Sequence, residues 1–154
     1  MAKAARKATK KAAVRERQQI AALPYVIVSG RALVCLATSR ETRRWIIPKG
    51  WPRKGTAPHV QAAAEAMEEA GLTGFISPAA IGHYSYLKRV EGKPSIRCRV
   101  TVYPMLVMEQ ALDWPERHER QLSWLQAHTA AGKVDEPELA NMMATLDKMR
   151  LRAD

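Results

Sequence analysis

The chain has 154 residues, of which 47% are hydrophobic and 26% are charged, and this indicates one domain that can bury its own core. Eight glycines and nine prolines are too few for a collagen-like or largely disordered chain, and no apolar run approaches the roughly 18 residues of a membrane span. Two cysteines, Cys35 and Cys98, are too few for a disulfide framework, and no secretory hydrophobic segment is present. We therefore expect reduced thiols and a cytoplasmic protein.

Positive charge is concentrated near the N-terminus. The chain holds 25 lysines and arginines against 15 aspartates and glutamates, a net charge of +10. Seven of the basic residues and one acidic residue lie in residues 1–22, which therefore carry +6, and the remaining 132 residues carry only +4. Such a basic arm binds nucleic acid or an acidic membrane surface, resembles a transit peptide in composition, or is a solvated extension. We expect a basic, flexible tail over residues 1–19 and a single domain over residues 20–154.

The first half of the domain predicts a hairpin followed by a helix. Two apolar segments, 22–28 and 32–37, flank Ser29-Gly30-Arg31 and read as strand, tight turn and strand. A polar loop leads to a short strand at Trp45–Ile47, and prolines and glycines interrupt regular structure from Pro48 onward. Pro58–Ala70 is the clearest helix, since proline is favoured in a first turn and Gly71 suits a left-handed C-cap.

The second half predicts further strands and a terminal helix. Gly74–Ile76 starts a strand, and residues 81–90 and 95–108 form two more around the Glu91–Pro94 turn. In the later strand, apolar residues alternate with polar ones, which is a period of two. Residues 122–131 read as a short helix and residues 137–151 as a final one. Strands with a helix between them and a helix at the end predict a mixed α/β sandwich.

Three glutamates cluster on the predicted helix. Glu65, Glu68 and Glu69 are spaced i, i+3 and i+4, so their carboxylates lie on one face. No lysine or arginine lies between Lys54 and Lys88 to relieve their repulsion. Hard oxygen ligands at fixed spacing suit magnesium or manganese. On spacing alone, a divalent-cation site and a solvated acidic face both remain open.

The segment that contains these glutamates resembles the Nudix box, G-x5-E-x7-R-E-U-x-E-E-x-G-U, where U is a bulky aliphatic residue. The register is ungapped, and the matching residues are Gly50, Glu65, Glu68, Glu69, Gly71 and Leu72. Thr56 stands where the box has glutamate, Ala64 stands where it has arginine, and Ala66 is smaller than the usual aliphatic residue. The flanking RWIIPKGW and WPE…R…W segments extend the resemblance over residues 18–145, toward the diphosphoinositol-polyphosphate and diadenosine-polyphosphate branch, especially its short bacterial members.

The resemblance implies a fold, a reaction and a set of roles. The fold is an α/β/α sandwich with a mixed sheet, and the reaction is hydrolysis of a phosphoanhydride bond in a nucleoside- or inositol-linked diphosphate. Glu65, Glu68 and Glu69, with a backbone carbonyl of Lys49 or Gly50, would hold Mg²⁺ or Mn²⁺. Glu65 or Glu68 would take the proton of the attacking water.

The two departures from the box have different implied consequences. The family arginine braces the glutamates, which Ala64 cannot do, and such losses typically cost roughly 10–100-fold. Thr56 removes only a support of the loop. Activity is therefore expected to be reduced rather than lost, and the sequence does not say whether another lysine or arginine replaces the brace.

Cations on both sides of the predicted site suit a polyphosphate, because arginine makes forked contacts with phosphate oxygens. We expect substrate contacts from Lys49, Arg44, Arg53 and Lys88, and solvated surface positions for about half of the neighbouring basic residues. Trp51, Trp114 and Trp124 either stack on a base or provide packing. Two other functions stay open: a non-catalytic ligand sensor with this fold, and a nucleic-acid-associated protein acting through its tail. The sequence does not indicate an oligomeric state.

Overall fold

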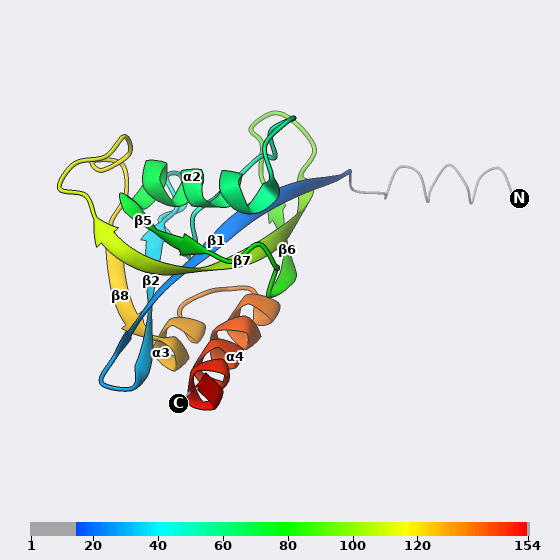
Figure 1. Ribbon diagram of the computed structural model, residues 1–154. Coiled ribbons are helices and arrows are strands. Elements are labelled where there is room, and N and C mark those ends of the chain that lie inside the picture. The colour runs from blue at the N-terminus through cyan, green and yellow to red at the C-terminus, as the bar shows by residue number, and fades with distance from the viewer. Residues whose placement is uncertain (1–14, 154) are drawn as a thin grey trace, which may run out of the picture.

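Two long strands lying side by side organise the sheet. In the computed structural model, which describes residues 15–153, β1 (Glu16–Val28) and β7 (Ile96–Gln110) pair in parallel from Glu16 opposite Arg97 to Tyr25 opposite Leu106. Both strands are longer than their other partners, so each pairs with different strands along its two halves. The long strands thereby hold together the two ends of the sheet, as Figure 1 shows.

The remaining strands are shorter and are distributed around this pair. The sheet path runs β3-β2-β1-β7-β5, while β4 pairs with β1, β6 with β7 and β8 with β2. These shorter strands are β2 (Arg31–Thr38), β3 (Trp45–Ile46), β4 (Lys49–Gly50), β5 (Leu72–Ile76), β6 (Gly82–Lys88) and β8 (Leu122–Gln126). Among the strand pairings of residues 15–153, only that of β1 with β7 is parallel, so the sheet is mixed, as predicted.

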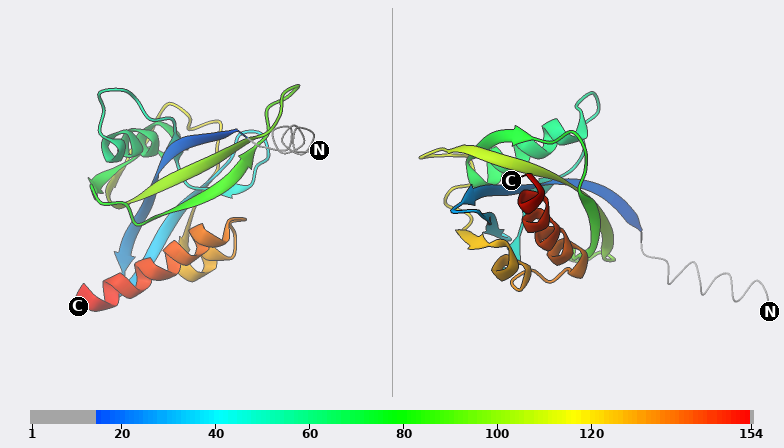
Figure 2. Two further views of the ribbon diagram at one scale, coloured as in Figure 1. Left: turned by 90° about the vertical axis from the view of Figure 1, so that its right-hand side faces the viewer. Right: turned by 60° about the horizontal axis from the view of Figure 1, so that its bottom comes forward.

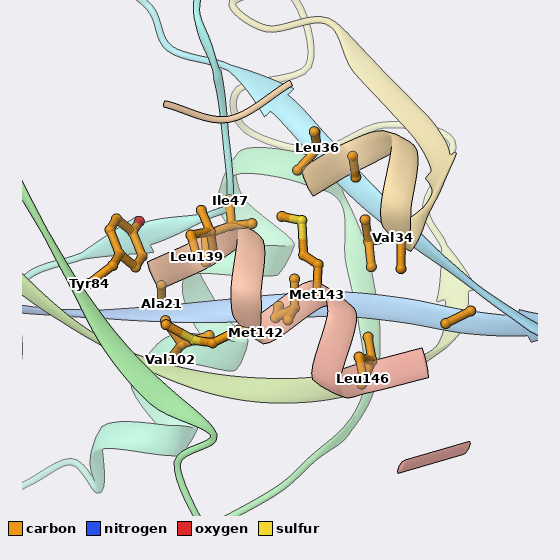
Figure 3. Close-up of a cluster of buried hydrophobic side chains, with 14 of the residues drawn as sticks. Ala21, Val34, Leu36, Ile47, Tyr84, Val102, Leu139, Met142, Met143 and Leu146 are labelled. Atoms are coloured by element: carbon orange, nitrogen blue, oxygen red, sulfur yellow. The ribbon is translucent and has the colours of Figure 1, made fainter. Parts of the chain in front are cut away.

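Helices cover both faces of the sheet. Helix α2 (Pro58–Ala70) lies on one face, and α3 (Ala127–Ala131) and α4 (Pro137–Ala153) lie on the other, as Figure 2 shows. One apolar cluster packs α3 and α4 against β1 and β2, and it includes Leu139 and Met143 together with Val34 and Leu36 (Figure 3). A second cluster packs the alanines of α2 against the opposite face. The predicted α/β/α sandwich is therefore confirmed.

Most of the predicted elements are present. The turn between β1 and β2 has positive φ at both central residues, 47° at Ser29 and 79° at Gly30, as a two-residue hairpin turn requires. The predicted helix has the same bounds as the observed α2, and Gly71 ends it with φ 69°. No helix within residues 15–153 is long and apolar enough to cross a membrane.

Several predicted boundaries differ from the structure, most of them by a few residues, and a short strand, β4, lies where an interruption from Pro48 onward was predicted. Residues 122–131, expected as one helix, begin instead as strand β8, and only residues 127–131 are helical. Leu122 and Trp124 pack against the α2 core cluster while Leu125 packs against the other, so pairing with β2 overrides the local helical tendency. The expected end of the tail at residue 19 falls inside β1, which begins at Glu16. Residues 1–14 of the predicted tail lie outside the described residues.

Candidate active site

Helix α2 brings the three glutamates into one cleft. Its alanines at 62, 66 and 70 are fully buried, and their small side chains let the helix pack closely on the sheet. Glu65, Glu68 and Glu69 consequently line a cleft of about 960 Å³ that also contains Lys49 and Gly50. Glu69 is buried, Glu65 is partly buried and Glu68 is exposed. The shared face predicted from their spacing is therefore present.

Glu69 is the most constrained of these carboxylates. Its Oε2 accepts a hydrogen bond from the backbone N–H of Lys49 at 2.9 Å, and its Oε1 lies 2.9 Å from Nη2 of Arg120. Burial raises the pKa of Glu69 to about 7, against the opposing effects of Arg120 and Lys49. Glu69 therefore joins α2 both to the loop before it and to a distant arginine.

Glu65 lies directly against Gly50. A Cβ atom placed on Gly50 would be only 2.3 Å from the Oε1 atom of Glu65, so the carboxylate occupies the space that a side chain would need. Gln61 donates a hydrogen bond to the same oxygen at 3.0 Å. Burial raises the pKa of Glu65, and the negative charges of Glu68 and Glu116 add to the rise. A glycine is therefore required at residue 50 because the Glu65 carboxylate lies too close for a side chain there, and not because the backbone has a positive φ.

Glu116 and Arg120 are among the residues of this cleft that the sequence prediction missed. Both come from the loop between β7 and β8, and both line the cleft beside the α2 glutamates. Nη2 of Arg120 lies 2.8 Å from Oε1 of Glu116, and Nε of Arg120 donates a hydrogen bond to the same oxygen at 2.9 Å. The WPE…R…W pattern marked this loop, but nothing in the sequence indicated that it folds over the end of α2.

The loop is fixed to α2 by backbone and indole hydrogen bonds. The N–H of Glu116 donates to the carbonyl of Glu68 at 3.1 Å, and Nε1 of Trp114 donates to the carbonyl of Glu69 at 3.2 Å. The indole also lies over Gly71, where a Cβ atom would be 2.5 Å from the ring. These bonds satisfy carbonyls at the C-terminal end of the helix. Trp114 therefore has a packing role.

The predicted substrate residues line the same cleft. Lys49, Arg44, Arg53 and Lys88 all do so, and Arg40 and Arg89 join them. Four other basic residues that are near these in the sequence do not line the cleft: Arg43, Lys54, Arg97 and Arg99. The structure therefore distinguishes the basic residues that line the cleft, which are candidate phosphate contacts, from basic residues elsewhere on the surface. The sequence alone could not make this distinction.

Two of these cations are held by neighbouring side chains. Nη1 of Arg44 lies 2.6 Å from Oε2 of the buried Glu136. The guanidinium of Arg44 and the ammonium of Lys49 lie 5.5 Å and 5.1 Å from the ring centre of Tyr86. Burial lowers the pKa of Lys49 to about 8, although Glu69 opposes the shift. Arg44 is therefore held in the cleft by Glu136, and both Arg44 and Lys49 lie against the Tyr86 ring.

The tryptophans are not equivalent. Trp51 lines the cleft, but Arg17 and Lys88 lie 4.8 Å and 5.1 Å from its ring centre. Trp124 packs in the cluster beneath α2, and its Nε1 faces Oε1 of Gln110 at 3.5 Å. Only Trp51 is therefore placed to meet a substrate, and cations already contact its ring.

The donor set can be compared with what a divalent cation needs. Within residues 15–153, no three acidic, histidine or cysteine side chains converge on a common point. Glu69 is engaged with Lys49 and Arg120, and Glu65 is turned toward Gly50. The chemistry of the set nevertheless fits, because the negative charges of Glu68 and Glu116 lie close enough to Glu65 to raise the pKa of its carboxyl group. A hard dication would neutralise that charge.

The sandwich, the loop–helix and its glutamates together define a protein of the Nudix fold. No family model matches the chain. It is 28% identical over 127 residues to Nudix hydrolase 18, mitochondrial, of Arabidopsis thaliana, covering 78% of this chain and 66% of that protein. It is also 28% identical over 113 residues to Nudix hydrolase 16, mitochondrial, of the same plant, covering 71% and 62%. The chain thus spans less than two thirds of the length of these curated relatives.

Solved structures share the fold. The Caenorhabditis elegans Ap4A hydrolase, in a binary complex, superposes with a TM-score of 0.61 at 20% identity, covering 86% of this chain and 96% of that one. The Nudix domain of Shewanella oneidensis NrtR, in complex with ADP-ribose, gives a TM-score of 0.62 at 13% identity, covering 94% and 98%. These structures share the Nudix fold, and the curated relatives named as Nudix hydrolases agree with the resemblance found in the sequence.

Proposed function

We propose that the protein is a Nudix pyrophosphohydrolase that cleaves the phosphoanhydride bond of a nucleoside- or inositol-linked diphosphate with the aid of Mg²⁺ or Mn²⁺. One observation carries the proposal: a single cleft holds the box glutamates together with Lys49, Arg44, Arg53 and Lys88. Carboxylates suit a divalent cation and a water molecule, and the cations suit the phosphates of the substrate. The relatives named as Nudix hydrolases support the same reaction class.

The residues of the cleft divide the reaction between them. Lys49 and Arg44 bind phosphate oxygens, and Arg53 and Lys88 extend this binding along the chain of phosphates. Water attacks a phosphorus atom, its proton passes to Glu65 or Glu68, and the bond from that phosphorus to the bridging oxygen breaks. A dication held by Glu65, Glu68, Glu69 and the carbonyl of Gly50 would neutralise charge on the phosphates and lower the pKa of bound water.

The aromatic rings of the cleft bear on the substrate class. Tyr86 and Trp51 are the two aromatic side chains that line it, and each already has two cations near its ring. Stacking of a nucleobase would have to displace these cations. Recognition through phosphates therefore favours a diphosphoinositol polyphosphate, with diadenosine polyphosphate as the second candidate. A cytoplasmic location remains our expectation.

The test is product detection by mass spectrometry. The protein is incubated with Mg²⁺ and a pool of inositol pyrophosphates, dinucleotide polyphosphates, nucleoside triphosphates, nucleotide sugars and capped RNA, with a metal-free control. We expect metal-dependent loss of one class, and no loss with Glu69→Gln, which keeps the shape of the side chain. Equal turnover by this variant would refute the roles assigned to the glutamates.

A ligand sensor without turnover is the second candidate function. Thr56 and Ala64, which depart from the box, favour it. It predicts heat of binding in calorimetry with a member of the same pool and no product in the mass spectrum. Metal-dependent product formation by the wild-type chain would exclude it.

A further inference from the structure

The arginine of the box is absent from α2, yet a buried arginine from another segment reaches the same glutamates. Position 64 holds an exposed alanine. The side chain of Arg120, only 7% exposed, lies against Glu69 and Glu116. We propose that Arg120 is the positioning residue that replaces the missing box arginine and fixes both carboxylates in the cleft. This inference rests on the proposed hydrolase function for its kinetic consequences.

The guanidinium group of Arg120 contacts three different residues. Nη2 bridges Oε1 of Glu69 at 2.9 Å and Oε1 of Glu116 at 2.8 Å. Nε donates to Glu116 at 2.9 Å, and Nη1 donates to the backbone carbonyl of Thr38 at 3.1 Å. Each nitrogen therefore has an acceptor. A planar guanidinium makes this arrangement and the single ammonium of lysine reproduces only part of it.

The segment that carries Arg120 is anchored on both sides of the residue. Trp114 and Glu116 bond to carbonyls of α2, as described above. On the other side, the N–H of Gln121 donates to Oγ1 of Thr38 at 2.9 Å, and the N–H of Thr38 donates to the carbonyl of Gln121 at 3.0 Å. Arg120 thus spans the gap between α2 and the end of β2 from a fixed backbone.

The consequence for the cleft is positional. Two carboxylates that share one cation can lie close together without repelling each other, so Glu116 stays beside Glu69 only while Arg120 is present. Glu69 in turn holds the N–H of Lys49, the residue before Gly50. Removing Arg120 should therefore disturb the carboxylates and the adjoining loop while leaving the cations Arg53 and Lys88 in place.

The experiment compares Arg120→Ala and Arg120→Lys with the wild-type chain. Arg117→Ala is the matched control, since Arg117 lies in the same loop, is 47% exposed and pairs only with Asp113 and the Trp114 ring among the described contacts. We expect kcat to fall roughly 10–100-fold in Arg120→Ala with KM little changed, and lysine to restore part of the loss. Arg117→Ala should match the wild type.

Two readouts do not depend on turnover. Mn²⁺ affinity, measured by calorimetry, should weaken in Arg120→Ala and remain unchanged in Arg117→Ala. A crystal structure of Arg120→Lys, the variant expected to fold if alanine does not, should show the carboxylates of Glu69 and Glu116 displaced from their wild-type positions. If the wild-type chain hydrolyses nothing in the pool, the proposed function fails, while these two readouts still decide the role of Arg120.

The proposal is overturned if a folded Arg120→Ala chain binds Mn²⁺ as tightly as the wild type does. It is also overturned if the lysine variant is as impaired as the alanine variant while both remain folded, or if KM rises and kcat does not. A rise in KM alone would assign Arg120 to substrate binding instead.

Discussion

Replacing Gly50 with alanine tests the placement of Glu65. A Cβ atom at residue 50 would lie 2.3, 2.4 and 2.8 Å from Oε1, Cδ and Oε2 of Glu65, whereas ordinary contact begins at 3.4 Å. The carboxylate must therefore retreat by about 1 Å, and a misplacement of that size costs roughly 100-fold in rate. We expect Gly50→Ala to lower kcat by about that factor.

Stability should change little in this variant. The displaced atoms are the end of a flexible side chain, and Gly50 does not have a positive φ. Alanine in an extended segment gains roughly 0.5–1 kcal/mol over glycine through chain entropy, which offsets part of the strain. The free energy of unfolding, from urea titration, should therefore stay close to that of the wild type while kcat falls.

The assay is steady-state hydrolysis of the substrate found in the phosphoanhydride screen. Gly132→Ala is the matched control, because a Cβ there would lie 3.5 Å from its nearest neighbour, the carbonyl oxygen of Thr129. Gly132→Ala should retain full activity. A folded Gly50→Ala enzyme within about threefold of the wild-type kcat would refute the argument that the position of Glu65 limits the reaction.

Three further results are expected. In Gly71→Ala, φ 69° costs roughly 1–2 kcal/mol and the new Cβ meets the Trp114 ring at 2.5 Å, so urea titration should show a loss above that range. Lys49, whose pKa burial lowers to about 8, loses its charge as pH rises through that value, so kcat/KM should fall above pH 8. Lys49→Arg stays charged and should not show this fall; an identical profile would contradict the assignment. Deleting residues 1–14, which leaves β1 whole, should abolish any salt-dependent RNA binding in gel-shift titrations if the basic tail causes it; unchanged binding would exclude the tail.

Local sequence patterns were sufficient to predict the elements whose conformation depends on residues nearby in the chain. The Ser29-Gly30 turn, α2 with its Gly71 cap, and the β6–β7 hairpin all follow from spacing and turn chemistry. Residues 122–126 form a strand and not the predicted helix, because their conformation depends on pairing with β2, nearly ninety positions earlier in the chain. The same dependence places the start of β1 at Glu16, where β7 supplies the partner.

The fold class, the glutamate face of α2 and the family resemblance could be predicted from the residues alone, because they depend on helical periodicity and on a short ungapped motif. The folded chain was needed to show which cations share the cleft with the glutamates and which tryptophan lines it. It alone brought Glu116 and Arg120 to Glu69, which lies 51 positions before that arginine in the chain. These contacts form because the loop after β7 folds back over the end of α2, and the path of such a loop cannot be predicted from local sequence patterns.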